Sequence, residues 1–423
     1  MAVIQPKRGE KMATKKKKDH ARKPAGQLIG VATIDITPPI GVKLAGYGSR
    51  KDPSVGVGHR LRAEALACEG TDGGWVLVTS DVIGYPRQCV LSVREKAQKK
   101  TGVPGAAMLI SGTHTHSGPV VRQIYQETEE APPLDRNYCN ELEEKLVCLI
   151  ADAWKARKEG FFEAAWTEAP ELGSNRRVQL PDGSWVNEWQ DFEGKHTGYF
   201  DPSVLLVGVR RPDGSRDCLF VNYGCHPVTL GPRNLRISAD YPGYLKDILE
   251  ARGVCRTAMF GLAGGGNINP RVCIMVGPEY PRRMGESLAE KVLGAVPNLS
   301  PVFPGKVRAG ASEWKFVSTR RRKGQRPWEK EEREVSSELQ ALRAGDLIFL
   351  GVPGELFSEY VAMFRDASPV PVTAVVSLAN DSVGYLPVDG AVPQGGHEVT
   401  FAACHYIQNA LVEHAKKAMS ATE

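Results

Sequence analysis

Short apolar and β-branched segments alternate with amphipathic segments along the whole chain, and this alternation constrains the fold more than any other feature. Short apolar runs are typical of strands in a covered sheet, whereas apolar residues three and four positions apart are typical of helices that pack on one face. The pattern predicts an α/β fold with a central mixed β-sheet flanked by helices. The predicted strands are 31–36, 75–79, 108–111, 204–209, 219–223, 258–262, 347–352 and 374–378. The predicted helices are 87–99, 141–156, 282–293, 358–365 and 400–417. We interpret the charged stretch at 319–334 as an exposed connection that leads into a further helix.

The length and composition fit one large domain or two moderate ones. The chain has 423 residues, of which 42% are hydrophobic and 24% charged, so it can build a sizeable core and is neither a disordered nor a fibrous protein. It contains no run of about eighteen uncharged apolar residues, so we expect no transmembrane segment. We predict a single large domain over 26–423, preceded by a basic disordered tail at 1–25.

The net charge of +5 comes from the first 24 residues, where Lys and Arg far outnumber Glu10 and Asp19. Such a segment can attract nucleic acids or anionic lipids, but a solvated tail is the simpler interpretation, and we predict no specific nucleic-acid partner. The segment lacks the apolar region of a secretory signal, so we expect a cytoplasmic protein. The nine cysteines include no CxxC pair, which favours reduced thiols over a disulfide framework.

Two histidines follow the predicted strand at 108–111, in the sequence Thr113-His114-Thr115-His116. If the strand continues through them, its two-residue period places both imidazoles on one face. Imidazole is a common zinc ligand and titrates near neutral pH, so the pair suits a metal ligand beside an acid/base group. Two structural histidines fit this pattern equally well.

A third histidine and a glutamate also stand just beyond predicted strands. His226 precedes Pro227, which stops regular strand pairing and places the histidine at the rim of the sheet. Glu355 follows a Pro-Gly turn. A core histidine and a helix-capping glutamate are the structural alternatives at these positions. Two histidines and one carboxylate with an open position are, however, a known form of catalytic zinc site.

A last polar segment runs from 380 to 398 and contains Tyr385 and His397. Glycines at 384, 395 and 396 allow a close approach of the backbone to other groups. From the pattern alone, both aromatic residues could equally be ordinary packing residues of a loop.

Taken together, these segments resemble the catalytic domain of the neutral/alkaline non-lysosomal ceramidase family. The most specific pieces are THTHSGP at 113–119 and VPGE at 352–355, and the resemblance extends from about residue 36 to residue 396. It implies that a zinc ion is held by His114, His226, Glu355 and Tyr385. It also implies that His116 lies beside the metal and assists proton transfer, and that Asn175 and Arg176 face the substrate.

The sequence departs from the family pattern at positions that meet the substrate. His397 stands where the family usually has a second active-site tyrosine, and Asn269 stands where a substrate-contacting serine is usual. The glycine-rich loop that contains Asn269 lacks the ending of a phosphate-binding loop, so we predict no nucleotide site. We also expect this chain to lack the C-terminal immunoglobulin-like domain and the secretion signal of well-known ceramidases.

The expected activity is zinc-dependent hydrolysis of a linear carboxamide. Zinc lowers the pKa of its bound water from 15.7 toward about 7 and polarises the scissile carbonyl, so no serine or cysteine nucleophile is needed. His116 would move the proton, and Tyr385 or His397 would donate a hydrogen bond to the oxyanion. The departures predict a small-molecule amide that is smaller or more polar than the lipid amide ceramide, with a pH profile sensitive to His397. An ester or lactone hydrolase on the same scaffold and a non-catalytic metal-containing binding protein are the alternatives.

Overall fold

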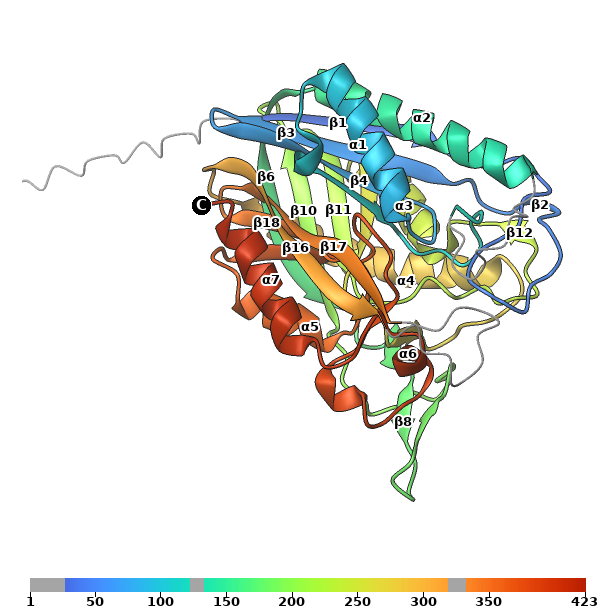
Figure 1. The fold of residues 1–423 in the computed structure, drawn as a ribbon. Coiled ribbons are helices and arrows are strands. Elements are labelled where there is room, and N and C mark those ends of the chain that lie inside the picture. Colours follow the sequence, from blue (N-terminus) through green and yellow to red (C-terminus); the bar gives the residue numbers. More distant parts are fainter. Residues whose placement is uncertain (1–26, 122–132, 319–331) are drawn as a thin grey trace, which may run out of the picture.

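A computed structural model of the protein describes residues 27–121, 133–318 and 332–423 (Figure 1). The predicted basic tail at 1–25 lies outside these ranges, as does most of the charged stretch at 319–334. The longest helix in the described part has 23 residues, and no helix there is both long and apolar enough to cross a bilayer. The nine cysteines are all free, as predicted, and six of them are buried.

A mixed sheet of nine strands forms the centre of the molecule. Its central strands pair in an antiparallel manner, whereas the pairs at the two edges, β4 with β5 and β11 with β13, are parallel. The short strand β15 (Ser300–Pro301) also pairs with β6. In spatial order the other strands are β13 (Thr257–Leu262), β11 (Arg216–Tyr223), β10 (Ser203–Arg210), β6 (Lys158–Glu168), β1 (Gln27–Asp35), β3 (Arg62–Gly70), β4 (Gly73–Ser80) and β5 (Met108–Gly112).

A second sheet packs against one face of the first. Its four strands, in spatial order, are β16 (Val307–Ser318), β17 (Arg333–Ala344), β18 (Leu347–Gly351) and β20 (Val372–Val376). Phe349 of β18 lies between the two layers, with its ring centroid 5.8 Å from Trp75 and 5.2 Å from Phe220 of the first sheet. These fully buried aromatic side chains hold the two sheets together.

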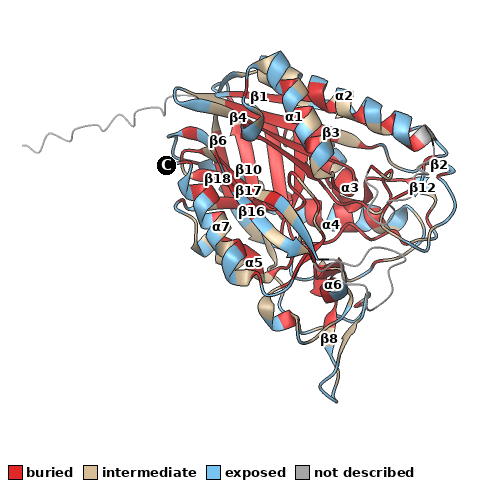
Figure 2. Cartoon of the chain, viewed as in Figure 1, coloured by how far each residue is buried: buried red, intermediate tan, exposed pale blue. Residues whose placement is uncertain are grey.

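Helices cover the outer faces of the two sheets (Figure 1). On β10, Val207 belongs to the core cluster that contains Phe349, whereas Leu206 belongs to the cluster that contains Leu245 and Leu288 of two covering helices. This alternation is the two-residue period of a strand that is buried on both faces, and Figure 2 shows the buried strands at the centre. The helices are α1 (Arg87–Thr101), α2 (Pro133–Lys155), α3 (Asp240–Ala251), α4 (Glu279–Ala295), α5 (Glu359–Asp366), α6 (His397–Thr400) and α7 (Gln408–Ser420).

Short elements complete the structure. Four two-stranded sheets join segments that are distant in the sequence. They pair β2 (Gly56–Val57) with β12 (Arg236–Ile237), β7 (Gly173–Asn175) with β14 (Ile268–Pro270), β8 (Arg177–Gln179) with β9 (Trp185–Asn187), and β19 (Glu355–Leu356) with β21 (Tyr385–Leu386). The 3₁₀ turns are η1 (Gly105–Ala107), η2 (Val296–Asn298) and η3 (Asp389–Ala391).

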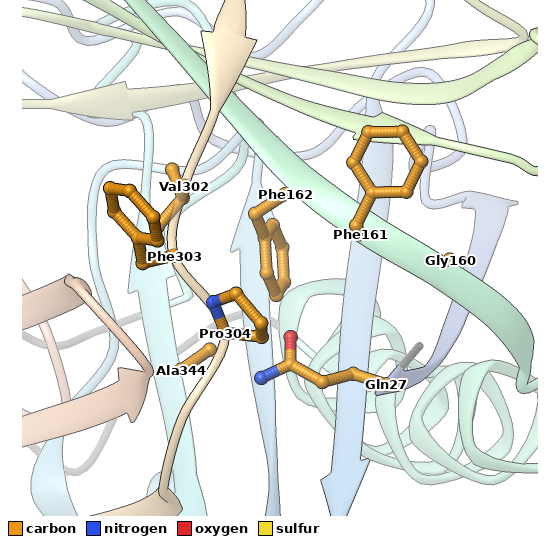
Figure 3. Close-up of a pocket in the computed structure, with 8 residues that line it drawn as sticks. All are labelled: Gln27, Gly160, Phe161, Phe162, Val302, Phe303, Pro304 and Ala344. Carbon is orange, nitrogen blue, oxygen red and sulfur yellow. The ribbon is translucent and has the colours of Figure 1, made fainter. Parts of the chain in front are cut away.

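Figure 3 shows a pocket at the place where β1 and β6 meet the segment after β15. Its lining is mainly apolar, with Phe162, Phe303 and Pro304 around the buried amide of Gln27. The Gln27 nitrogen has no hydrogen-bond partner among the described residues. The pocket includes none of the residues predicted to carry chemistry.

The predicted mixed α/β fold is confirmed, and each of the eight predicted strands falls on a strand of the structure. Two helical predictions are wrong. Residues 401–407 are not helical, so the predicted helix at 400–417 reduces to α7, which begins at Gln408. The charged stretch at 319–334 was expected to lead into a helix, but the described residues after it form β17, where the partners β16 and β18 provide the backbone hydrogen bonds.

A buried ionic cluster joins α3 to the central sheet. The Nζ atom of Lys246 lies 2.8 Å from Glu64 Oε1 and 2.9 Å from both carboxylate oxygens of Asp81. All three side chains are at most 1% exposed. Asp81 follows β4 and also accepts a hydrogen bond from the backbone N–H of Arg62, so the cluster ties α3 to β3 and β4.

We predict that Lys246→Met lowers the free energy of unfolding by about 3–5 kcal/mol, because it removes the cation that contacts both buried carboxylates and leaves Glu64 only one cationic contact, the longer one with Arg62 at 3.4 Å. Urea denaturation measures this change. The control is Lys99→Met, which removes an exposed i,i+4 partner of Glu95 and should change stability far less. Equal losses in the two variants would contradict a stabilising role for the buried cluster.

Candidate metal centre

The loop after β5 presents two of the predicted residues. β5 ends at Gly112, and His114 has a positive φ of 75°, so the expectation that the strand continues through both histidines is wrong. The backbone N–H of His114 donates to Val82 O at 2.9 Å, which fixes the turn. The turn still brings the imidazoles together, with 3.3 Å between the Nε2 atoms of His114 and His116.

His226 and Glu355 meet the same point from other parts of the fold. His226 lies three residues beyond β11, and its Nε2 is 3.0 Å from that of His114. Glu355 begins β19, and its Oε2 lies 3.3 Å from His114 Nε2 and 3.4 Å from His226 Nε2. The structure therefore brings together these three predicted metal ligands.

Backbone carbonyls determine which nitrogen of each histidine faces the cluster. The Nδ1 of His114 is 2.7 Å from Ile83 O, and the Nδ1 of His226 is 2.6 Å from Gly265 O. A carbonyl oxygen only accepts, so both Nδ1 atoms carry protons and both neutral imidazoles direct an Nε2 lone pair at the cluster. Glu355 Oε2 receives no hydrogen bond from the described residues. Two lone pairs and an unpaired carboxylate oxygen at one point fit a bound cation, and this donor set suits zinc.

Burial favours the neutral form of His226 and His116, and the neutral form of an imidazole is the one that binds a metal. Desolvation, with a smaller contribution from the charge of Arg176, lowers the pKa of His226 to about 4. Desolvation and the neighbouring His114 hold the pKa of His116 well below its ordinary value. The ligand atoms of His114, His116 and His226 all lie within 4.8 Å of one another, so the geometry also permits His116 as a metal ligand.

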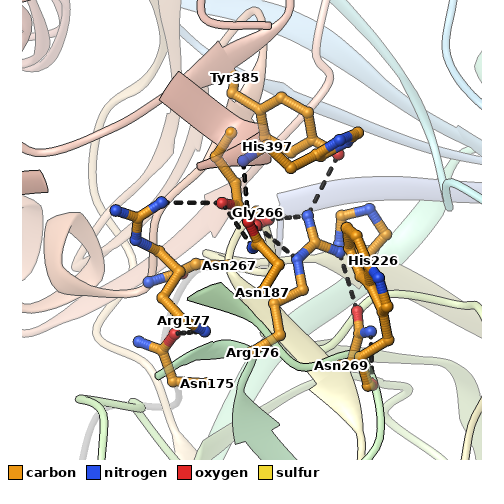
Figure 4. Close-up of polar contacts among 12 residues, drawn as sticks. Asn175, Arg176, Arg177, Asn187, His226, Gly266, Asn267, Asn269, Tyr385 and His397 are labelled. Carbon is orange, nitrogen blue, oxygen red and sulfur yellow. Dashed lines mark hydrogen bonds and ion pairs between the residues drawn. The ribbon is translucent and has the colours of Figure 1, made fainter. Parts of the chain in front are cut away.

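The parallel pairing of β19 with β21 places Tyr385 beside Glu355. Burial and the negative charge of the Glu355 carboxylate raise the pKa of Tyr385 well above its usual value. The Nη2 of Arg176 donates to the same hydroxyl at 3.2 Å (Figure 4). Tyr385 therefore adjoins the cluster, as expected of a fourth ligand or of a hydrogen-bond donor to the substrate.

Arg176 connects the cluster to other predicted substrate-binding residues. Its Nη1 donates to Asn269 Oδ1 at 2.9 Å, and its Nη2 donates to Gly266 O at 2.7 Å (Figure 4). The Nε donates to Glu398 at 2.6 Å. Arg176 and Asn269, which come from two separate motifs, thus lie in direct contact.

His397 and Asn175 have different surroundings. The ring of His397 lies 5.4 Å from that of Tyr385 and 5.3 Å from that of Trp189, so it adjoins the cluster. Asn175 donates to Tyr199 O at 2.8 Å and accepts from the backbone N–H of Arg177 at 3.0 Å. Its hydrogen bonds within the described chain tie backbone segments together, and none of them reaches the histidines.

Several residues that carry none of the predicted roles also surround the site. Trp189 lies with its ring centroid 5.1 Å from the guanidinium carbon of Arg176 and is 37% exposed. Tyr47 packs its ring 5.1 Å from that of His116. A Cβ on Gly46, where φ is 97°, would lie 2.3 Å from the ring of His116, so only glycine fits there. No local pattern marks Trp189, whereas Gly46 and Tyr47 lie within the resemblance.

Residues 27–261 match the family model of the neutral/alkaline non-lysosomal ceramidases, N-terminal domain. The chain belongs to this family. Neutral ceramidase B of Dictyostelium discoideum is 24% identical over 260 residues, which cover 57% of this chain and 35% of that protein. The chain thus spans about a third of the length of this curated relative.

Solved ceramidase structures share the fold. The neutral ceramidase of Pseudomonas aeruginosa superposes with a TM-score of 0.78 over 93% of this chain and 74% of its own, at 18% identity. A ceramidase complexed with C2 gives a TM-score of 0.77 over 93% and 75% of the two chains, at 17% identity. These similarities confirm the mixed α/β architecture.

Proposed function

We propose that this chain is a zinc-dependent hydrolase of the ceramidase type that cleaves a carboxamide bond. The observation that carries the proposal is the convergence of two imidazole lone pairs and the unpaired Glu355 oxygen at one point. Membership of the ceramidase family supports an amide bond as the target. An ester or lactone hydrolase on the same scaffold is the second candidate, since the same donor set activates water for either bond.

His114, His226 and Glu355 would hold the metal, with Tyr385 as a fourth ligand. A zinc ion bound there supplies a Lewis acid for the carbonyl group and lowers the pKa of water. The neutral His116 presents its Nε2 to the same place, so it can accept a proton there and return it to the leaving amine. Its buried Nδ1 has no hydrogen-bond partner in the described chain.

The other residues around the cluster can orient the substrate. Arg176 and the Tyr385 hydroxyl are preorganised donors for the negative charge that develops on the carbonyl oxygen. His397, Asn269 and Trp189 adjoin this pair and would contact the rest of the substrate. We propose a substrate smaller or more polar than ceramide, because His397 and Asn269 depart from the family at these places.

We expect one zinc ion to copurify with the chain. His114→Ala, His226→Ala and Glu355→Ala should each lose both the metal and amide hydrolysis, because each removes one of the proposed metal ligands. Elemental analysis of the purified variants measures the zinc content. The control is His414→Ala on α7, where the ring contacts Ser312, and it should retain zinc. Full zinc occupancy in the three ligand variants would refute the proposed site.

His116→Ala should keep zinc but reduce kcat by about a hundredfold to ten-thousandfold, the usual range for a general acid or base. Gly46→Ala should produce a similar loss, since the added methyl group displaces the His116 ring. Gly48→Ala is the matched control because a Cβ there meets nothing within 4 Å. Loss of zinc in His116→Ala would instead make this residue a ligand, and wild-type turnover would make it structural.

Substrate preference is tested by kcat/KM for long-chain ceramide and for short N-acyl amines. Wild type should prefer the short amides, and His397→Tyr should shift the ratio toward ceramide by about tenfold. His397→Phe keeps an aromatic ring without a donor and should leave the ratio near that of wild type. A strong wild-type preference for long-chain ceramide would overturn the proposed substrate class.

A further inference from the structure

The Glu398 carboxylate is completely buried and holds two arginines. Its Oε1 accepts from Arg176 Nε at 2.6 Å, and its Oε2 accepts from Arg177 Nη1 at 2.9 Å. The amide nitrogen of Asn187 lies 2.9 Å from both oxygens. Figure 4 shows three of its partners, Arg176, Arg177 and Asn187, near Tyr385. Both carboxylate oxygens are therefore fully engaged.

The backbone next to Glu398 leaves space for its partners. Glu398 is the second residue of the short helix α6, which begins directly after Gly395 and Gly396. These two glycines have positive φ values of 64° and 92°. A Cβ on Gly396 would lie 2.9 Å from Asn187 Oδ1 and 3.0 Å from Arg177 Nη1. The glycine thus leaves room for the residues that surround Glu398.

Arg176 is 3% exposed, and a buried guanidinium needs a carboxylate partner. Glu355, the proposed metal ligand, is a second carboxylate in its neighbourhood. One tyrosine lies between the two groups, because the Tyr385 hydroxyl accepts from Arg176 Nη2 at 3.2 Å and Tyr385 is the partner of Glu355 in the pairing of β19 with β21. If Glu398 lost its charge, Glu355 would be the remaining carboxylate near Arg176. No other anion among these contacts would then compete with Glu355 for the guanidinium.

We propose that Glu398 is a positioning residue, the counter-ion that keeps Arg176 away from Glu355 and so leaves the Glu355 carboxylate available to the metal. Glu398 itself does not contact the histidine cluster. The inference rests on the proposed function only in taking Glu355 as a metal ligand. Glu398 thereby controls metal affinity indirectly, because it determines the position of Arg176.

The test is the zinc dissociation constant, measured by competition with a chromogenic chelator. Glu398→Gln keeps the size of the side chain but removes its charge, and it should weaken zinc binding by about tenfold or more. Adding Arg176→Met should restore affinity to within about threefold of wild type, because no guanidinium then competes for Glu355. A merely structural role predicts that the double variant binds zinc no more tightly than Glu398→Gln. That result, or wild-type affinity in Glu398→Gln, would overturn the inference.

Glu163→Gln is the matched control. Glu163 is a buried carboxylate 2.6 Å from Arg216 at the start of β11, at the opposite end of the strand from His226. Its loss should destabilise the fold without weakening zinc binding. Equal weakening in the two glutamine variants would assign the effect to the fold and refute the role of Glu398.

A crystal structure of Glu398→Gln gives a readout that needs neither zinc nor activity. The guanidinium of Arg176 should move from Asn269 to an ion pair with Glu355. An unchanged Arg176 would overturn the inference. If wild type binds no zinc or hydrolyses no amide, the proposed function fails, and the position of Arg176 in the variant still decides the inference.

Discussion

Two backbone carbonyl groups determine what the site can bind. Ile83 O and Gly265 O fix the protons of His114 and His226 on Nδ1, so the lone pairs on Nε2 face each other and Glu355. If the protons were instead on Nε2, both histidines would direct N–H groups at the cluster, and they would donate hydrogen bonds there and could not bind a metal. Ile83 follows β4 and Gly265 follows β13, at the ends of strands that are parallel to β5 and β11. The sheet thus supplies each ligand together with the neighbouring group that orients it.

The site also depends on the contact between the two sheets. His114 and His226 follow strands of the nine-stranded sheet, whereas Glu355 and Tyr385 follow β18 and β20 of the four-stranded sheet. The distance between the two pairs is therefore fixed by the core between the layers, where Phe349 packs against the first sheet. Close-packed interiors tolerate little change in volume, so this core keeps all the ligands within a few ångströms of one another.

The sequence predicted the strands well because buried strands are continuous apolar runs, and the site residues follow such runs. β3 and β17 carry glutamate and arginine among their apolar residues, and neither was predicted, since their pairing depends on neighbours distant in sequence. The positive φ of His114 could not be predicted from the sequence either. The predicted convergence of the two histidines therefore held, although the strand geometry invoked for it did not.

Residues that act on other side chains are the hardest to predict. His114 and Glu355 stand in short motifs, whereas Glu398 gains its importance only because the fold places it against Arg176, 222 positions earlier in the chain. The segments that carry Arg176, Asn269 and Glu398 are loops and short elements outside the two large sheets. Such segments can change without disturbing the core. The sheets thus position the proposed metal ligands, whereas loops and short elements carry the groups proposed to contact the substrate.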